Sequence, residues 1–171
     1  SKYSMAIAEE LRLDRETKKL LMISSLCHDV GKIGIPDQIL KKASLLSAEE
    51  YADMKLHPTI GAAIINHMPN AKRFISGVKH HHEKWDGSGY PKGLKGAELL
   101  MASRILAVAN AFVAMVSARA YRAGLPLKDA LDKLLAEADT KYDRHVVAAL
   151  FHVAQNRQEW DSWSSPRSGK G

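Results

Sequence analysis

Three consecutive histidines, at positions 80–82, offer several imidazole nitrogens within about one helical turn. The segment after them, residues 83–96, contains several glycines and a proline, so it cannot continue a helix. Imidazole is a frequent ligand of divalent transition metals, and the three residues therefore predict a metal site at a helix end beneath a loop. A solvated helix terminus explains them equally well when they are considered alone.

A second group of chemically active residues lies upstream. His28 and Asp29 end one helical pattern, and Lys32 follows about one turn later. Imidazole and carboxylate groups can hold divalent cations, a carboxylate can bridge two of them, and an ammonium can contact a phosphate. Because side chains at helix ends can converge from separate helices, metal-assisted phosphate hydrolysis is the favoured interpretation. The five candidate ligands all end helical patterns: His28, Asp29, His57, His81 and His82.

The elements that must position these residues are helices. Apolar residues recur at helical spacing, with helices expected at residues 14–30, 47–57, 58–69, 70–82 and 99–116. Ser47 and Glu50 have the spacing of a capping box, which marks the start of one helix. There is no strand pattern and no internal repeat. The sequence therefore predicts an all-α fold, a single helical bundle of about seven helices.

The most hydrophobic of these helices contains one polar side chain, Asn110, between Ile105 and Val116. Leaving a buried amide unpaired costs about 1–3 kcal/mol, so we expect Asn110 to be buried with a partner. A hydrogen bond between helices would satisfy it without any further role.

Composition restricts the class of protein. The chain has 171 residues, 25 Lys and Arg against 19 Asp and Glu, a net charge of +6, and only 6% aromatic residues. The basic residues are dispersed, which favours a small anionic ligand over nucleic acid. No apolar stretch is long enough for a membrane span, and a single cysteine, Cys27, excludes an internal disulfide. We expect a cytoplasmic domain at residues 1–158, with its first helix truncated, and a partly disordered tail at 159–171.

Three segments together resemble the HD-GYP family, within the HD superfamily of metal-dependent phosphohydrolases. They are HDVGKIGIP at 28–36, HPTIG at 57–61 and HHEKWDGSGYP at 81–91. The similarity continues through residues 93–96, 104–110 and 119–122, and it extends from about residue 3 to residue 151. The order and length of the three motifs make the resemblance specific.

The resemblance implies a bacterial phosphodiesterase in two-component signalling that hydrolyses cyclic di-GMP to pGpG, GMP or both, through a metal-activated water. It implies one or two divalent ions per site, iron or manganese. The implied metal ligands are His28, Asp29, His57, His81, His82 and Asn110. Asp29 and Lys32 are the implied catalytic residues, and the implied substrate contacts are Lys32, Tyr90, Arg119 and Arg122.

Two positions depart from the family pattern, and they leave an alternative function open. Asn110 and Val113 stand where the family has aspartates, so a second ion should bind more weakly. The alternative is therefore a catalytically impaired module that binds cyclic di-GMP or a diguanylate cyclase (GGDEF) partner through the GYP loop. The family also implies an upstream sensory or receiver domain. Hydrolysis of nucleoside monophosphates or of (p)ppGpp, found in the wider superfamily, does not explain residues 86–91.

Overall fold

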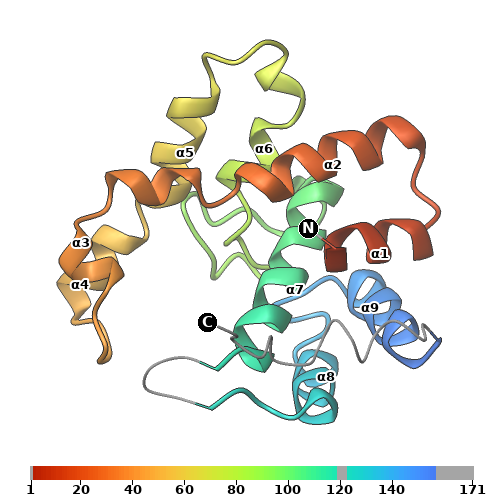
Figure 1. Ribbon diagram of the computed structural model, residues 1–171. Coiled ribbons are helices and arrows are strands. Elements are labelled where there is room, and N and C mark those ends of the chain that lie inside the picture. Colours follow the sequence, from red (N-terminus) through yellow and green to blue (C-terminus); the bar gives the residue numbers. More distant parts are fainter. Residues whose placement is uncertain (1, 119–122, 157–171) are drawn as a thin grey trace, which may run out of the picture.

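The helix α7 (Met101–Val116) runs through the middle of the molecule, and helices from earlier and later parts of the chain pack against it (Figure 1). The computed structural model describes residues 2–118 and 123–156. Within these ranges the further α-helices are α1 (Lys2–Glu10), α2 (Arg15–Cys27), α3 (Asp37–Leu40), α4 (Ala48–Met54), α5 (His57–Ile65), α6 (Ile75–Lys79), α8 (Leu127–Ala136) and α9 (Arg144–Asn156). Three short 3₁₀ helices, η1 (Val30–Gly34), η2 (Ala71–Arg73) and η3 (Gly96–Glu98), lie between them.

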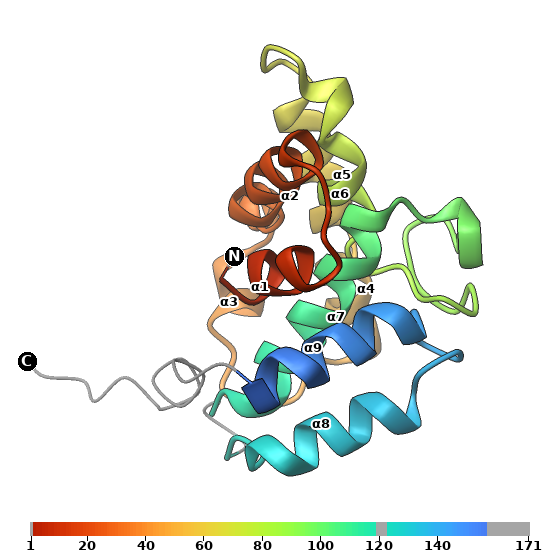
Figure 2. The same ribbon diagram turned by 90° about the vertical axis from the view of Figure 1, so that its right-hand side faces the viewer.

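One half of the molecule is a continuous apolar core. Helices α1, α8 and α9 lie against α7, and α1 also packs on α2 (Figure 2). Phe112 of α7 is fully buried there and meets the ring of Tyr3 edge to face, with the ring centroids 5.2 Å apart. Leu134 of α8 and Leu150 of α9 are also fully buried. Burial of these faces holds the first and last described helices together.

The other half is formed by α2, η1, α5 and α6, and its apolar cluster is small. The fully buried or nearly buried members are Ile65, Ala71, Phe74 and Val78. Polar and backbone contacts supplement it. The hydroxyl of Ser24 donates to the carbonyl of Phe74, at 2.9 Å, which ties α2 to the segment before α6.

A close approach of two backbones joins η1 to α5. A Cβ atom placed on Gly31 would lie 1.9 Å from the carbonyl oxygen of His57 and 2.4 Å from the nitrogen of Gly61. Only glycine therefore fits at position 31, and this contact brings the end of α2 against the start of α5.

The all-α prediction is confirmed, with no strand in the described residues beyond one isolated bridge between Ala138 and Tyr142. Nine α-helices lie in the described ranges, rather than about seven, because short pieces such as α3 form separate helices. The capping box is present: Ser47 N donates to Glu50 Oε2 at 2.7 Å, and Glu50 N donates to Ser47 Oγ at 3.2 Å.

Three local expectations were wrong. His57 begins α5 instead of ending α4, because Lys55 and Leu56 form a turn that ends the earlier helix. The helix expected from residue 70 starts only at Ile75, because Asn70 has a positive φ of 60°. Asn110 is half-buried rather than buried.

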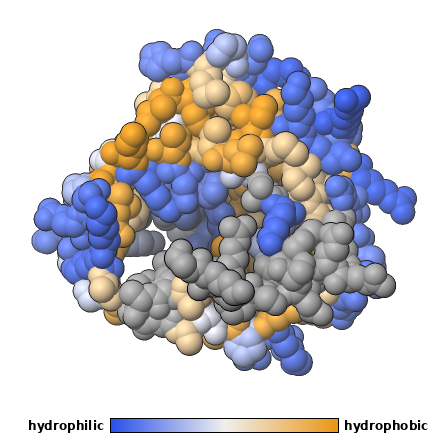
Figure 3. All heavy atoms as spheres, viewed as in Figure 1, coloured by the Kyte–Doolittle hydropathy of each residue, from blue (hydrophilic) through white to orange (hydrophobic). Residues whose placement is uncertain are grey.

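Exposed apolar side chains gather on one face. Figure 3 shows an apolar band over the part of the molecule that holds α2 and α5. The exposed apolar side chains of these two helices include Met22 and Leu26 of α2 and Ile64 of α5. Among the described residues, no helix is both long and apolar enough to cross a membrane.

Candidate metal centre

Three histidines from two separate parts of the chain meet at one point. One nitrogen from each of His57, His81 and His82 lies within 4.8 Å of the others, and His57 and His81 are buried. The Nε2 atoms of His57 and His81 are 3.3 Å apart. His57 comes from the start of α5, whereas the other two follow the end of α6, so the packing of α5 on α6 creates the group.

Backbone carbonyls orient three of the histidines in the same way. The Nδ1 atom of His57 lies 2.7 Å from the Met54 carbonyl oxygen, and Nδ1 of His81 lies 2.6 Å from that of Val78. His28 repeats the arrangement with the carbonyl three residues before it, at 2.8 Å. Because a carbonyl can only accept, Nδ1 carries the proton in each ring and Nε2 keeps its lone pair. The rings are therefore set to present Nε2 as a ligand.

Asp29 lies between two of the histidines and a lysine. Its Oδ1 is 3.5 Å from His57 Nε2, and its Oδ2 is 3.5 Å from His28 Nε2. The Lys32 ammonium donates to the same Oδ2 at 2.7 Å. Burial alone would raise the pKa of Asp29, but the Lys32 hydrogen bond and the charges around it together hold the pKa below its usual value. The carboxylate is thus anionic and placed between imidazoles.

The buried histidines are neutral. Burial, reinforced by the neighbouring imidazoles, lowers the pKa of His81 to about 2 and that of His82 to about 3. Burial also lowers the pKa of His57. Neutral imidazole is the form that binds metal, so no proton must be displaced from these rings at pH 7.

His28 lies at the edge of the group. Its ring centroid is 5.1 Å from that of His81, in an edge-to-face arrangement. All five ligands expected from the sequence are therefore gathered in one region. The donor set, neutral imidazoles around a carboxylate, fits a divalent transition metal.

The GYP loop, residues 83–96, covers one side of this group. Tyr90 stacks on His82, with the centroids 4.9 Å apart and the rings inclined by 17°. Burial raises the pKa of Tyr90, and the phenol of Tyr51 and the carboxylate of Asp29 raise it further. Its hydroxyl is therefore protonated, and it lies near the site. Asn110 lies on α7, half-buried, while Arg119 and Arg122 lie outside the described residues.

The sequence interpretation gave no role to Glu83. Its carboxylate is 1% exposed and accepts backbone N–H groups from Lys92, at 2.7 Å, and Leu94, at 3.1 Å. The only sign of this role in the sequence was an ionisable side chain directly after the histidines. The residues that bond to Glu83 are nine and eleven positions away, so no local pattern connects them. His80 is separate from the other histidines: its Nδ1 lies 3.1 Å from Ser76 Oγ.

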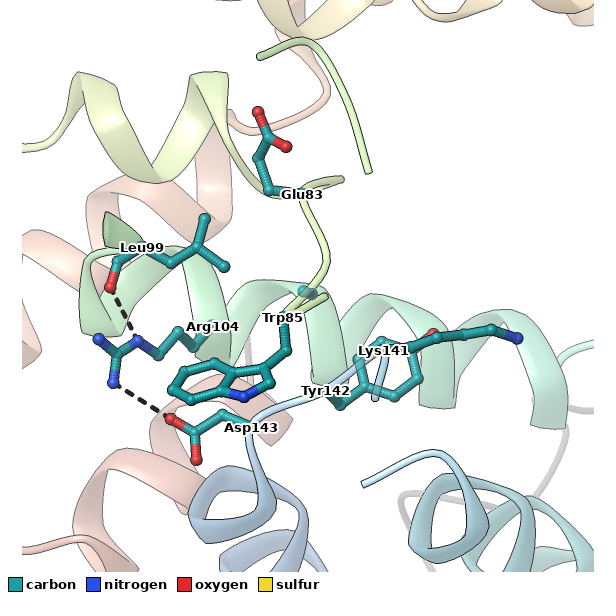
Figure 4. Close-up of a pocket in the computed structure, with 8 residues that line it drawn as sticks. Glu83, Trp85, Leu99, Arg104, Lys141, Tyr142 and Asp143 are labelled. Carbon is teal, nitrogen blue, oxygen red and sulfur yellow. Dashed lines mark hydrogen bonds and ion pairs between the residues drawn. The ribbon is translucent and has the colours of Figure 1, made fainter. Parts of the chain in front are cut away.

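A second unanticipated contact, at Trp85, fixes the beginning of the loop. Arg104 of α7 lies over the ring of Trp85, 5.0 Å from its centroid, and donates to the Leu99 carbonyl at 2.8 Å. Its Nη1 also donates to Asp143, the residue before α9, at 3.2 Å (Figure 4). Trp85 N donates to the carbonyl of Lys141. The loop is thus anchored to α7 and to the turn before α9.

Comparison with known proteins agrees with this geometry. The family model described as HD domain matches residues 1–146. The chain therefore belongs to the HD domain family, and its motifs place it in the HD-GYP branch.

Relatives and solved structures share this class. The chain is 37% identical over 171 residues to a cyclic di-GMP phosphodiesterase of Thermotoga maritima, covering 96% of this chain and 46% of that protein. It is 39% identical over 148 residues to the cyclic di-GMP phosphodiesterase response regulator RpfG of Xanthomonas campestris, covering 84% and 39%. The fold matches Bd1817, an HDG"Y"P protein from Bdellovibrio bacteriovorus, with a TM-score of 0.71 and 24% identity over 90% of this chain and 49% of that one. The chain thus spans less than half the length of these proteins.

Proposed function

We propose that this chain is the catalytic domain of a metal-dependent phosphodiesterase that hydrolyses cyclic di-GMP to pGpG, GMP or both. The observation that carries the proposal is the gathering of three neutral imidazoles within 4.8 Å of one another, with an anionic carboxylate 3.5 Å from one of them. Such a donor set suits divalent cations, and a cationic lysine beside it suits a phosphate.

The residues of the site would have separate roles in binding metal and substrate. Six would hold one or two divalent ions, iron or manganese: His28, Asp29, His57, His81, His82 and Asn110. Bound ions would supply Lewis acidity and activate water for attack on phosphorus. Asp29 would bridge, since its two oxygens face different histidines. Lys32, now paired with Asp29, would contact a phosphate oxygen.

The activities for which relatives are named support the substrate class. Two relatives are cyclic di-GMP phosphodiesterases at 37% and 39% identity, and a third is 3'3'-cGAMP-specific phosphodiesterase 1 of Vibrio cholerae at 32% identity over 161 residues. A cyclic dinucleotide is common to all of them, and the higher identities favour cyclic di-GMP. Tyr90 would contact it beside the metal site, and Arg119 and Arg122 remain predicted phosphate contacts.

Metal loading followed by a turnover assay tests the proposal. We expect the chain, loaded with Mn²⁺ or Fe²⁺, to hydrolyse cyclic di-GMP faster than 3'3'-cGAMP. Asp29→Asn should lower turnover by at least about 100-fold, because it removes the anionic ligand. Asp37→Asn is the matched control, since Asp37 also pairs with a lysine but lies on exposed α3. A metal-loaded chain that cleaves neither dinucleotide would contradict the proposal.

An impaired nucleotide-binding module is the second candidate, and the uncharged amide at Asn110 is the observation that favours it. A neutral ligand stabilises a second cation less than a carboxylate does. Asn110→Asp decides between the two. If the unmodified chain binds cyclic di-GMP without cleaving it and Asn110→Asp restores turnover, the missing charge explains the defect.

The wider setting is also proposed rather than observed. The similarity to RpfG, which is a response regulator, supports a link to two-component signalling and to an upstream receiver domain. A GGDEF-domain partner at the GYP loop and a cytoplasmic location remain predictions.

A further inference from the structure

One of the four histidines around the candidate metal centre is held differently from the rest. His28, His57 and His81 each contact a carbonyl three residues earlier through Nδ1. Across residues 2–118 and 123–156, by contrast, the ring of His82 makes no hydrogen bond of its own. Its ring instead contacts three neighbouring rings: those of His57 and His81, with centroids 5.1 and 4.2 Å away, and that of Tyr90, stacked at 4.9 Å and 17°. The direction of His82 therefore depends in part on the loop that carries Tyr90, which supplies the stacked contact.

The loop is folded tightly back onto the end of the histidine segment. Tyr90 N donates to the carbonyl of His82 at 3.2 Å. At Gly89 a Cβ atom would lie 2.4 Å from Lys84 N and 2.5 Å from Glu83 Cα, so the backbone passes with no room for a side chain. This close passage places Tyr90 over the ring of His82.

The buried carboxylate of Glu83 holds the same loop in place through hydrogen bonds. Its carboxylate, 1% exposed, receives one N–H bond on each oxygen, from Lys92 and from Leu94. Lys92 is two residues after Tyr90, so one of these bonds fixes the chain just beyond the stacked ring. A carboxylate is buried at high cost unless it is hydrogen-bonded, and bonds from amides to a charged acceptor are strong. The loop conformation and the buried carboxylate therefore depend on each other.

We infer that Glu83 is a positioning residue for the metal ligand His82: its buried carboxylate fixes the loop that holds Tyr90 against the His82 ring. Glu83 touches neither the substrate nor a metal ion in this role. It orients the His82 ring through the loop, whereas a backbone carbonyl orients each of His28, His57 and His81 directly. The inference rests on the proposed metal site, and it adds the group that orients one of its ligands.

Mn²⁺ affinity of the metal-stripped chain, measured by titration calorimetry, tests the inference without an activity assay. Glu83→Gln keeps the side-chain size but places an NH₂ group against one of the two backbone N–H donors. We expect Mn²⁺ binding to weaken by about 10–100-fold, the usual effect of losing an outer partner of a ligand. Glu98→Gln is the matched control, because Glu98 also accepts a backbone N–H in this loop, from Lys95 at 2.7 Å, but is exposed and bonds the chain beyond Leu94. It should change the affinity less than twofold.

The route through Tyr90 is tested by a double-mutant cycle. Tyr90→Ala should weaken Mn²⁺ binding as Glu83→Gln does, whereas Tyr90→Phe keeps the stacked ring and should retain the affinity. Adding Glu83→Gln to Tyr90→Ala should cause little further loss, because both act on the same contact.

Three results would overturn the inference. Glu83→Gln could lower the melting temperature while leaving Mn²⁺ affinity unchanged, which would make the residue merely structural. Tyr90→Ala could leave the affinity unchanged, a result that does not depend on whether the Glu83 variant folds. The losses of Mn²⁺ affinity caused by Glu83→Gln and by Tyr90→Ala could also add in full in the double variant. Failure of the unmodified chain to bind Mn²⁺ would instead reject the metal site itself, and this inference with it.

Discussion

The two halves of the molecule are stabilised by different means. Around α7, side chains such as Phe112, Leu134 and Leu150 are fully buried in one large apolar cluster. Around the histidines, the fully buried side chains include His57, His81 and Glu83, and the local apolar cluster is small. Apolar burial needs no particular direction, whereas a buried imidazole or carboxylate needs a partner at a defined angle. The first half therefore supplies stability, and the second uses directed hydrogen bonds to set geometry.

The largest effect on stability should come from the apolar half. Phe112→Ala should lower the free energy of unfolding by about 3–5 kcal/mol, because it leaves a cavity beside Tyr3 in the main core. Urea denaturation measures this change. Val113→Ala, at the next position but 39% exposed, should change it by less than about 0.5 kcal/mol. Similar losses from both variants would show that burial in this core is not what stabilises the apolar half.

The next effect should come from the contact that anchors the GYP loop to α7. Arg104→Ala should lower the free energy of unfolding by about 2–3 kcal/mol, because the buried carboxylate of Asp143 loses a charged donor. Trp85 would also lose the guanidinium over its ring. Arg104→Lys keeps the charge without the planar fork and should recover part of the loss. Equal stability of the Ala and Lys variants would show that the charge has no role.

A smaller loss of stability, with a larger effect on the site, should follow from Gly31→Ala. The added Cβ would push η1 away from α5 and so separate Asp29 from His57. Overpacking of this kind costs about 1–3 kcal/mol, and Mn²⁺ affinity should fall as well. Gly34→Ala is the matched control, because its Cβ would meet only the Ile60 side chain, at 3.1 Å. If both variants bind Mn²⁺ equally well, the close approach does not set the site.

The smallest change should be produced by mild acid on the metal-free chain. In the unfolded chain histidine binds a proton below about pH 6.5, whereas burial keeps His81 and His82 neutral in the folded chain, with pKa values of about 2 and 3. The unfolded state thus binds more protons, and stability is present above pH 6.5 and lost as the pH falls. Each histidine should account for about 0.7 kcal/mol between pH 7 and pH 6.

Urea denaturation at the two pH values measures this loss. His82→Gln should reduce the pH dependence of the free energy of unfolding by the contribution of one histidine. The same slope in both proteins would show that His82 is not responsible.

The sequence was a good guide to where ligands lie but a weaker guide to helix ends. All five ligands expected from their place near helix ends are gathered in one region, with His57, His81 and His82 at its centre. The error at His57 arose because a proline next to it fits equally well after one helix or in the first turn of the next. Asn70 was assigned as a helix start, yet its positive φ keeps it outside the helix.

What the sequence determined by itself was the chemistry available and the helical architecture, because residue types and apolar periodicity are local properties of the chain. Tertiary structure alone decided that the imidazoles are neutral and that Asp29 lies between them. It also decided that Glu83 is buried, with two amides as partners. These properties depend on burial and on hydrogen-bond partners contributed by distant residues, and neither is written in a local pattern.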